Sequence, residues 1–283
     1  MRLVTYMRDG QVRHGARIGE RIREYSAARC ILDIVSDPGG ATGGEFAVVD
    51  VQLLPPLTRP GKIICVGLNY TDHAKEGGNP IPDYPAIFLR AITSIASPGA
   101  PLIRPSMSEK LDFEAELAVV IGRTASRVSP AQALCHVAGY TCFNDGSVRD
   151  YQRKSTQWTI GKNFDRSGSF GPELVTADAL PSGAHGLRIT SRVNGKVMQD
   201  GNTGNMIFSV ATLVSVLSEC MTLEPGDIIA TGTPAGVGYA RTPPIFLKHG
   251  DVCEIEIEGI GTLRNPISDA VPADALEMEL VRS

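Results

Sequence analysis

The sequence predicts an α+β protein that is mostly β, and three observations support this class. Short runs of alternating or continuous apolar residues recur along the 283 residues, as is typical of strands. Gly, Pro, Asn and Asp separate these runs at short intervals. Few segments between them show helical spacing, which disfavours a doubly wound sheet, since that fold alternates strands with helices.

Residues 1–54 predict a small β-rich unit. Its alternating runs "RLVTYM", "QVRHGARI" and "AVVDVQLL" are separated by the turn residues Asp9-Gly10 and Pro38-Gly39-Gly40. The next stretch, "PPLTRPG" at 55–61, contains three prolines, which remove backbone donors and disfavour helix. We therefore expect a linker at 55–61 and a larger catalytic domain at 62–283.

Within the larger domain, strands and short helices follow one another. The segment from Asn69 to Tyr84 is polar and rich in turn residues, and it predicts a mobile loop. In "SPAQALCHVAGY" (129–140), Ser129 as a cap and Pro130 at the first helical position predict a helix. The other expected elements are strands at 62–67, 85–90, 116–122, 227–232 and 252–259, a strand, turn and helix start at 141–154, a hairpin at 187–199 and a helix at 209–220.

Composition excludes several classes. The hydrophobic share of 42% and the charged share of 20% are those of a globular protein. A net charge of -4 disfavours a nucleic-acid surface, so the expected partner is a small molecule. No run reaches the length of a membrane helix and no signal peptide precedes the first turn, so the expected location is the cytoplasm. The six cysteines form no C-x-x-C pair, which disfavours zinc and a disulfide framework.

A pair of glutamates stands at the start of an apolar run in "DFEAELAVVIG" (112–122). Because strand side chains alternate, Glu114 and Glu116 lie on one side of the strand, roughly 6.5 Å apart. They can converge on one ion. A solvated sheet face gives the same pattern, and "EIEIEG" at 254–259 is such a case in this chain.

Asp145 lies in an Asn-Asp-Gly turn and either caps the helix that starts near Val148 or joins the two glutamates. If the three carboxylates meet, their hard oxygen ligands select Mg²⁺, Mn²⁺ or Ca²⁺ over zinc. The ion would neutralise charge that is costly to bury.

Three further features are candidates for chemistry. His73 and Glu76 stand three residues apart, so they are neighbours if their segment forms a helical turn, and a carboxylate that orients an imidazole makes a general base. An exposed loop gives the same spacing. Lys162 follows the apolar "WTIG", which indicates partial burial, although most lysines lie on the surface. The Gly-rich stretch 231–238 lacks the spacing of a nucleotide loop and predicts a turn that offers backbone N–H groups to an anion.

Five ordered motifs together resemble the fumarylacetoacetate hydrolase family over roughly residues 61–267. They are "GLNYTDHAKE", "DFEAELAVVIG", "FNDGSVRDYQ", "WTIGKNFD" and "GDIIATGTPAGVG". The resemblance implies a mixed β-sandwich roll, in which residues 1–54 match the variable N-terminal extension. It also implies a homodimer.

The resemblance further implies roles for individual residues. Glu114, Glu116 and Asp145 would hold one divalent metal. His73 and Glu76 would be catalytic, in a loop that closes over substrate, and Lys162 would be the active-site lysine. The substrate would be bordered by Arg149, Gln152 and Thr233.

One position departs from the family pattern. Many members carry Lys-Pro after a strand that resembles "AIFL", whereas this chain has Arg90 and Ala91. Arginine offers a planar fork where lysine offers a point charge. Either recognition of the substrate carboxylate has changed at Arg90, or a structural ion pair has.

The resemblance predicts hydrolysis of a C–C bond in a 2,4-diketo acid, an acylpyruvate or fumarylpyruvate, with release of pyruvate, as in the catabolism of aromatic compounds. His73, oriented by Glu76, would activate a water, while the metal and Lys162 stabilise the developing negative charge. Oxaloacetate decarboxylation, keto–enol isomerisation and dehydration share the same metal, so they stay open as alternatives. A binding protein without activity is disfavoured because the whole residue set is intact.

Overall fold

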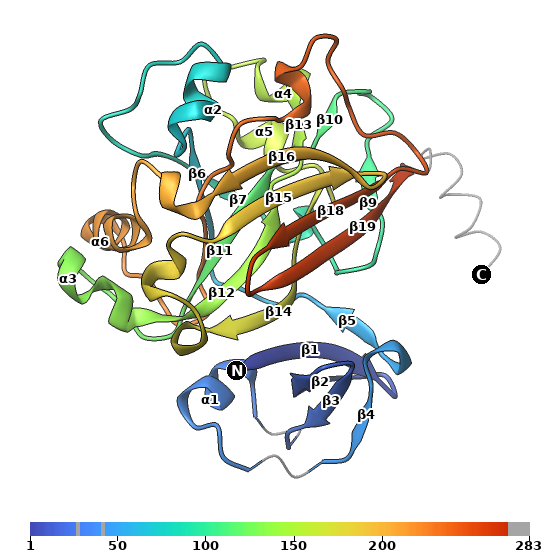
Figure 1. The fold of residues 1–283 in the computed structure, drawn as a ribbon, viewed down its shortest axis with the longest axis vertical. Helices are drawn as coiled ribbons and strands as arrows, with labels where there is room; N and C mark the ends of the chain where they lie inside the picture. Colours follow the sequence, from blue (N-terminus) through green and yellow to red (C-terminus); the bar gives the residue numbers. More distant parts are fainter. Residues whose placement is uncertain (27–28, 41–42, 271–283) are drawn as a thin grey trace.

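The computed structural model describes residues 1–26, 29–40 and 43–270. Most of its strands belong to one long sheet or to a second sheet of five strands. Figure 1 shows the N-terminal strands at one end of the molecule, with helices α2, α4 and α5 gathered at the other end. This mostly β architecture confirms the fold class that the sequence predicts.

The long sheet has the strand order β4-β3-β2-β1-β14-β12-β11-β17-β6-β7, with β5 paired to β1 and β8 paired to β14. Its strands are β1 (Arg2–Arg8), β2 (Gln11–Ile18), β3 (Arg21–Glu24), β4 (Glu45–Ala47), β5 (Gln52–Leu54), β6 (Ile63–Gly67), β7 (Ala86–Arg90), β8 (Ile95–Ala96), β11 (Ala115–Ile121), β12 (Val137–Asn144), β14 (Gly168–Thr176) and β17 (Ile228–Ala230).

The second sheet has the order β16-β15-β18-β19-β9, and β10 pairs with β13. These strands are β9 (Leu102–Arg104), β10 (Leu111–Asp112), β13 (Ser147–Val148), β15 (Arg188–Val193), β16 (Lys196–Asn202), β18 (Val252–Ile257) and β19 (Gly261–Asp269). The α-helices are α1 (Ile31–Ser36), α2 (Thr71–Glu76), α3 (Pro130–Ala133), α4 (Arg149–Gln152), α5 (Thr159–Lys162) and α6 (Val210–Cys220).

Strand β11 lies in the middle of the long sheet, between β12 and β17. Both of its faces are covered, which explains why its sequence is apolar almost throughout. Leu117, Val119 and Ile121 belong to the main core, together with residues of the second sheet such as Ile255. Ala118 belongs to a smaller cluster on the opposite face. The alternation of side chains therefore places Glu116 on that opposite face, away from the second sheet.

The N-terminal unit is β-rich, as expected, and it also contains the short helix α1. Strand β1 pairs with β14 through Arg2↔Val175 and Leu3↔Leu174, so the N-terminal strands extend the long sheet. Residues 55–61 contain no helix or strand. The division into residues 1–54, a linker at 55–61 and a domain at 62–283 stays a prediction, and its last residues, 271–283, lie outside the described part.

The helix predicted over 129–140 is wrong beyond its first turns. Helix α3 begins at Pro130 as expected, and a single 3₁₀ turn follows at Leu134–His136. From Val137 the chain is strand β12, which pairs with β11 on one side and β14 on the other. Two ladders of backbone hydrogen bonds outweigh the local helical pattern, and the β-branched Val137 and the aromatic Tyr140 suit a strand.

The polar segment between Asn69 and Tyr84 is not wholly a loop, because it contains helix α2. Asn69 is fully buried, and its side-chain amide donates to the carbonyl oxygens of Phe208 and Thr231. Tyr70 is buried as well. The predicted mobility of this segment stays a prediction, and the two buried anchors indicate that any moving part begins after Tyr70.

Candidate metal centre and active site

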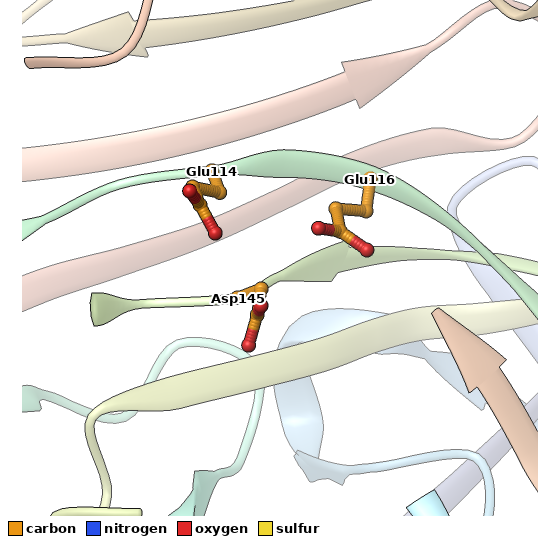
Figure 2. A group of neighbouring side chains, drawn as sticks. All are labelled: Glu114, Glu116 and Asp145. Carbon is orange, nitrogen blue, oxygen red and sulfur yellow. The ribbon is translucent and has the colours of Figure 1, made fainter. Parts of the chain in front are cut away.

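Glu114, Glu116 and Asp145 come together, and each offers a carboxylate oxygen within 4.8 Å of the others. Figure 2 shows Glu114 and Glu116 on one segment, with their side chains directed toward the neighbouring segment that carries Asp145. Glu116 lies in β11, and Glu114 precedes that strand by one residue. Ala115 pairs with Asn144 in β12, and the Asp145 amide donates to the Glu114 carbonyl at 3.0 Å. The register of two central strands therefore brings Asp145 beside the glutamates, and Asp145 does not act as a helix cap.

Buried cations surround two of the three carboxylates. The Lys162 ammonium lies 2.5 Å from oxygens of both Glu114 and Asp145. Arg149 approaches Glu114 to 2.6 Å, and Arg90 approaches Asp145 to 2.5 Å. Burial opposes ionisation of Glu114, but Arg149 and Lys162 outweigh it and hold the pKa of Glu114 below its usual range. Lys162 is buried, as its apolar preceding residues indicated.

Glu116 differs from its neighbours. Its side chain accepts a hydrogen bond from the Gly232 amide at 2.8 Å, and no ion pair joins it to a cation in the described part of the chain. Burial, together with the negative charges of Asp145 and Glu114, raises the pKa of Glu116 well above its usual value. When it is ionised, a buried carboxylate of this kind requires a positive charge that the described side chains do not supply.

The donor set fits a divalent cation. Four carboxyl groups, including Asp112, are buried in this network with three cations, Arg90, Arg149 and Lys162, so full ionisation of the four would leave one negative charge unbalanced. The carboxylates are hard oxygen ligands, which suit Mg²⁺, Mn²⁺ or Ca²⁺. The cluster is thus able to hold the metal that the sequence predicts.

The cluster lies in a pocket of about 200 Å³. Glu114, Glu116 and Asp145 line it together with five further residues that the sequence singled out: His73, Arg149, Gln152, Lys162 and Thr233. Phe88 and Trp158 contribute an apolar wall. Eight of the ten predicted site residues therefore line one cavity, and the other two, Glu76 and Arg90, lie behind the lining residues His73 and Asp145, respectively.

The pairing of His73 with Glu76 is looser than a base-orienting pair requires. Both lie on α2, as their spacing predicts, but the His73 Nδ1 to Glu76 Oε2 distance is 3.5 Å, beyond the usual hydrogen-bond range. Glu76 instead accepts from the Gly236 amide at 3.0 Å. His73 is buried, and its Nδ1 has no hydrogen-bond partner in the described part of the chain.

Arg90 requires a correction as a substrate-binding candidate. Its guanidinium is fully buried and donates to Asp145, to the Gly146 carbonyl and to the hydroxyls of Ser94 and Ser167. It does not line the pocket. The departure at this position therefore corresponds to a structural ion pair behind a metal-ligand candidate, because the donors of Arg90 face protein acceptors.

The Gly-rich stretch offers backbone N–H groups, as predicted, and the anions are the chain's own carboxylates. Gly232, Gly236 and Gly238 donate to Glu116, Glu76 and Asp112, respectively. Gly236 has φ +102°, and a Cβ there would lie 2.4 Å from the Met198 carbonyl oxygen. A side chain at this position would therefore displace the loop that holds these carboxylates.

Among the residues that sequence reasoning missed, Asp112 and Tyr239 connect the Gly-rich loop to the site. Asp112 accepts from Arg149 at 2.8 Å and from the amides of Gly238 and Tyr239, so it ties the Gly-rich loop to the cluster. Tyr239 lines the pocket and packs against Arg149. Asp112 is the first residue of the motif that carries both glutamates, and this position is the only sequence feature that could have indicated its role. Tyr239 had none.

Fold and cluster together define a class: mixed β proteins with a buried Glu-Glu-Asp centre at the edge of a pocket. A family model described as "Fumarylacetoacetate (FAA) hydrolase C-terminal" matches residues 62–268. The chain belongs to the fumarylacetoacetate hydrolase family, which confirms the resemblance.

Relatives carry names of several activities. The chain is 46% identical over 220 residues to human "Oxaloacetate tautomerase FAHD2A, mitochondrial", covering 77% of this chain and 70% of that protein. Among solved structures, a 2-hydroxyhepta-2,4-diene-1,7-dioate isomerase from Mycobacterium marinum is 38% identical, with a TM-score of 0.82 over 96% of this chain and 100% of that one. A fumarylacetoacetate hydrolase from Exiguobacterium antarcticum is 36% identical, with a TM-score of 0.81 over 95% and 100%.

The sequence analysis also made predictions about membrane helices, cellular location and oligomeric state. In the described residues, no helix has both the length and the apolar character needed to cross a membrane. The human relative is named as mitochondrial, so the cytoplasmic location of this chain stays a prediction. The homodimer stays a prediction as well.

Proposed function

We propose that this chain is a divalent-metal-dependent tautomerase that interconverts the keto and enol forms of a 2-oxo acid, with oxaloacetate as the first candidate. The observation that carries the proposal is that His73 and Lys162 line the same pocket as the three carboxylates. Tautomerisation moves one proton between C3 and the oxygen on C2, and it requires a proton acceptor beside a site that stabilises an oxyanion. The names of the tautomerase and isomerase relatives support this choice over hydrolysis.

A divalent ion held by Glu114, Glu116 and Asp145 would supply positive charge for the carboxylate and 2-oxo oxygens of the substrate. His73 takes the proton from C3 and passes it to the C2 oxygen to give the enol, and it moves the proton back in the reverse direction, since its imidazole lines the pocket and its Nδ1 has no hydrogen-bond partner among the described residues. Lys162 contributes a second positive charge, because burial, which disfavours its ammonium, is outweighed by Asp145 and Glu114, and the pKa of Lys162 is raised.

Hydrolysis of an acylpyruvate, which the sequence predicted first, is the second candidate. The placement of His73 and Glu76 on one face of α2 favours it, because Glu76 needs only a small movement to orient the imidazole toward a water. In the present geometry Glu76 is engaged by Gly236. That contact favours proton transfer by His73 alone over activation of water by the pair.

Product analysis distinguishes the candidates. Enol-rich oxaloacetate and an acylpyruvate are each mixed with metal-loaded protein and with chelated protein. The proposal predicts that metal-loaded protein removes the enol absorbance of oxaloacetate while total oxaloacetate is preserved. Rapid release of pyruvate and CO₂ would favour decarboxylation, and cleavage of the acylpyruvate with no effect on the enol would favour hydrolysis.

A further inference from the structure

Arg153 is a cationic residue at the rim of the pocket, and it does not pair with a carboxylate of the metal cluster. Arg153 lines the pocket and is exposed. It forms no ion pair with a carboxylate in the part of the chain that the structure describes. The buried cations differ in this respect, because Arg149 and Lys162 engage Glu114, while Arg90 engages Asp145.

The Arg153 guanidinium has a defined position despite its exposure. Its Cζ lies 4.5 Å from the centroid of the Tyr239 ring, and the Cζ of Arg149 lies 4.4 Å from the same ring. Arg149 and Arg153 are four residues apart and are linked by the backbone hydrogen bond from Arg153 to Arg149 at 3.2 Å. Stacking on a ring orients the plane of a guanidinium and leaves its N–H edge free to bind.

The backbone of Tyr239 is held in place by hydrogen bonds to a buried carboxylate. Its amide and that of Gly238 donate to the fully buried Asp112, at 3.0 and 2.8 Å. Asp112 also accepts from Arg149. The stack therefore rests on the same buried carboxylate that braces the metal cluster, so the position of Arg153 is coupled to that of the site.

We infer that Arg153, stacked on Tyr239, binds the second carboxylate of a dicarboxylic 2-oxo acid. The inference rests on the proposed function, which places the first carboxylate and the 2-oxo group at the cluster. A guanidinium fork suits a carboxylate because two parallel N–H donors match two oxygens. A monocarboxylic acid leaves Arg153 without a partner, so the residue selects dicarboxylic acids.

A solvated surface arginine is the alternative, and Lys154 provides the matched control. Lys154 is the next residue and is exposed, and its Nζ lies 3.3 Å from the centroid of the Tyr151 ring. It does not line the pocket. Arg153→Gln and Lys154→Gln thus remove one exposed, ring-stacked cation each. The two variants differ in whether the lost cation faces the pocket.

The test uses stable ligands, so it does not depend on turnover. Binding of malate and of 2-hydroxybutyrate to Mg²⁺-loaded protein is measured by calorimetry; these 2-hydroxy acids differ in the second carboxylate. Wild type and Lys154→Gln should prefer malate by roughly 10- to 100-fold, the range of a hydrogen-bonded charge pair, and Arg153→Gln should lose most of that preference.

The results that would overturn the role of Arg153 differ from those that would overturn the proposed function. An unchanged preference in Arg153→Gln, no preference in wild type, or no binding of either acid would overturn the inference. If wild type shows the Arg153-dependent preference but does not tautomerise oxaloacetate, the dicarboxylate site stands and the proposed reaction is wrong.

Discussion

Replacing Glu116 by glutamine should change metal affinity and metal-free stability in opposite directions. Glu116 is the cluster carboxylate without a cationic partner in the described part of the chain, and one of its oxygens lies within 4.8 Å of one oxygen each of Glu114 and Asp145. Glu116→Gln keeps the shape of the side chain and removes one negative charge. The variant should therefore bind a divalent ion more weakly, while its metal-free form should be more stable than metal-free wild type.

The size of the effect follows from the charges. Two unit charges about 4 Å apart interact by ~4 kcal/mol at an effective dielectric constant near 20, so a divalent ion and the Glu116 carboxylate interact by ~8 kcal/mol. Part of this energy is offset in wild type, because the raised pKa of Glu116 makes the side chain release a proton when the ion binds. Because the amide oxygen remains as a neutral ligand, we expect a loss of about 3 kcal/mol, or roughly 100-fold in metal affinity. At a concentration near 100 times its Kd, the ion stabilises wild type by about 2.7 kcal/mol, which raises Tm by roughly 5 °C.

Titration calorimetry with Mg²⁺ and Mn²⁺, and thermal melts with and without metal, measure both quantities. Glu254→Gln is the matched control, because Glu254 is a strand glutamate in the alternating run of β18, away from the cluster. It should keep the affinity of wild type. Equal metal affinity of Glu116→Gln and wild type would refute the assignment of Glu116 as a ligand, and a lower metal-free Tm of the variant would refute the argument from unbalanced charge.

Three further outcomes are expected. Lys162→Met should lose activity yet bind Mg²⁺ about tenfold more tightly or better by calorimetry, since the ammonium lies 2.5 Å from two carboxylates that the ion would share; weaker binding would show that Lys162 supports the metal. His73→Ala should retain metal binding and lose enol conversion by about 10²-fold or more, and unaltered conversion would assign the proton transfer elsewhere. Amide exchange between Thr71 and Tyr84 should slow when oxalate and Mg²⁺ are added, and equal exchange would argue against a closing lid.

The sequence predicted the cluster well because local rules decide its main parts. Side-chain alternation alone places Glu114 and Glu116 on one face, and helical spacing alone places His73 near Glu76. The meeting with Asp145 depends instead on the register of β11 and β12. No local pattern states that register, and the ordered motifs of the family supplied it.

The errors arise where contacts distant in sequence decide. The helical pattern of 129–140 gave way at Val137 to pairing with two strands. Arg90 was expected beside substrate, but the hydroxyls and carbonyls of residues up to 77 positions away surround its guanidinium. Tyr239 and Arg153 meet only because Asp112 holds the loop that carries Tyr239. Such arrangements need the assembled fold.

The most direct test of the central claim follows the C3 protons of oxaloacetate by NMR in D₂O. Metal-loaded wild type should exchange C3 hydrogen for deuterium far faster than the uncatalysed reaction, and chelated wild type, Glu116→Gln and His73→Ala should all lose that acceleration. Exchange in metal-loaded wild type at the uncatalysed rate would contradict the claim that this cluster and His73 carry out proton transfer on a 2-oxo acid.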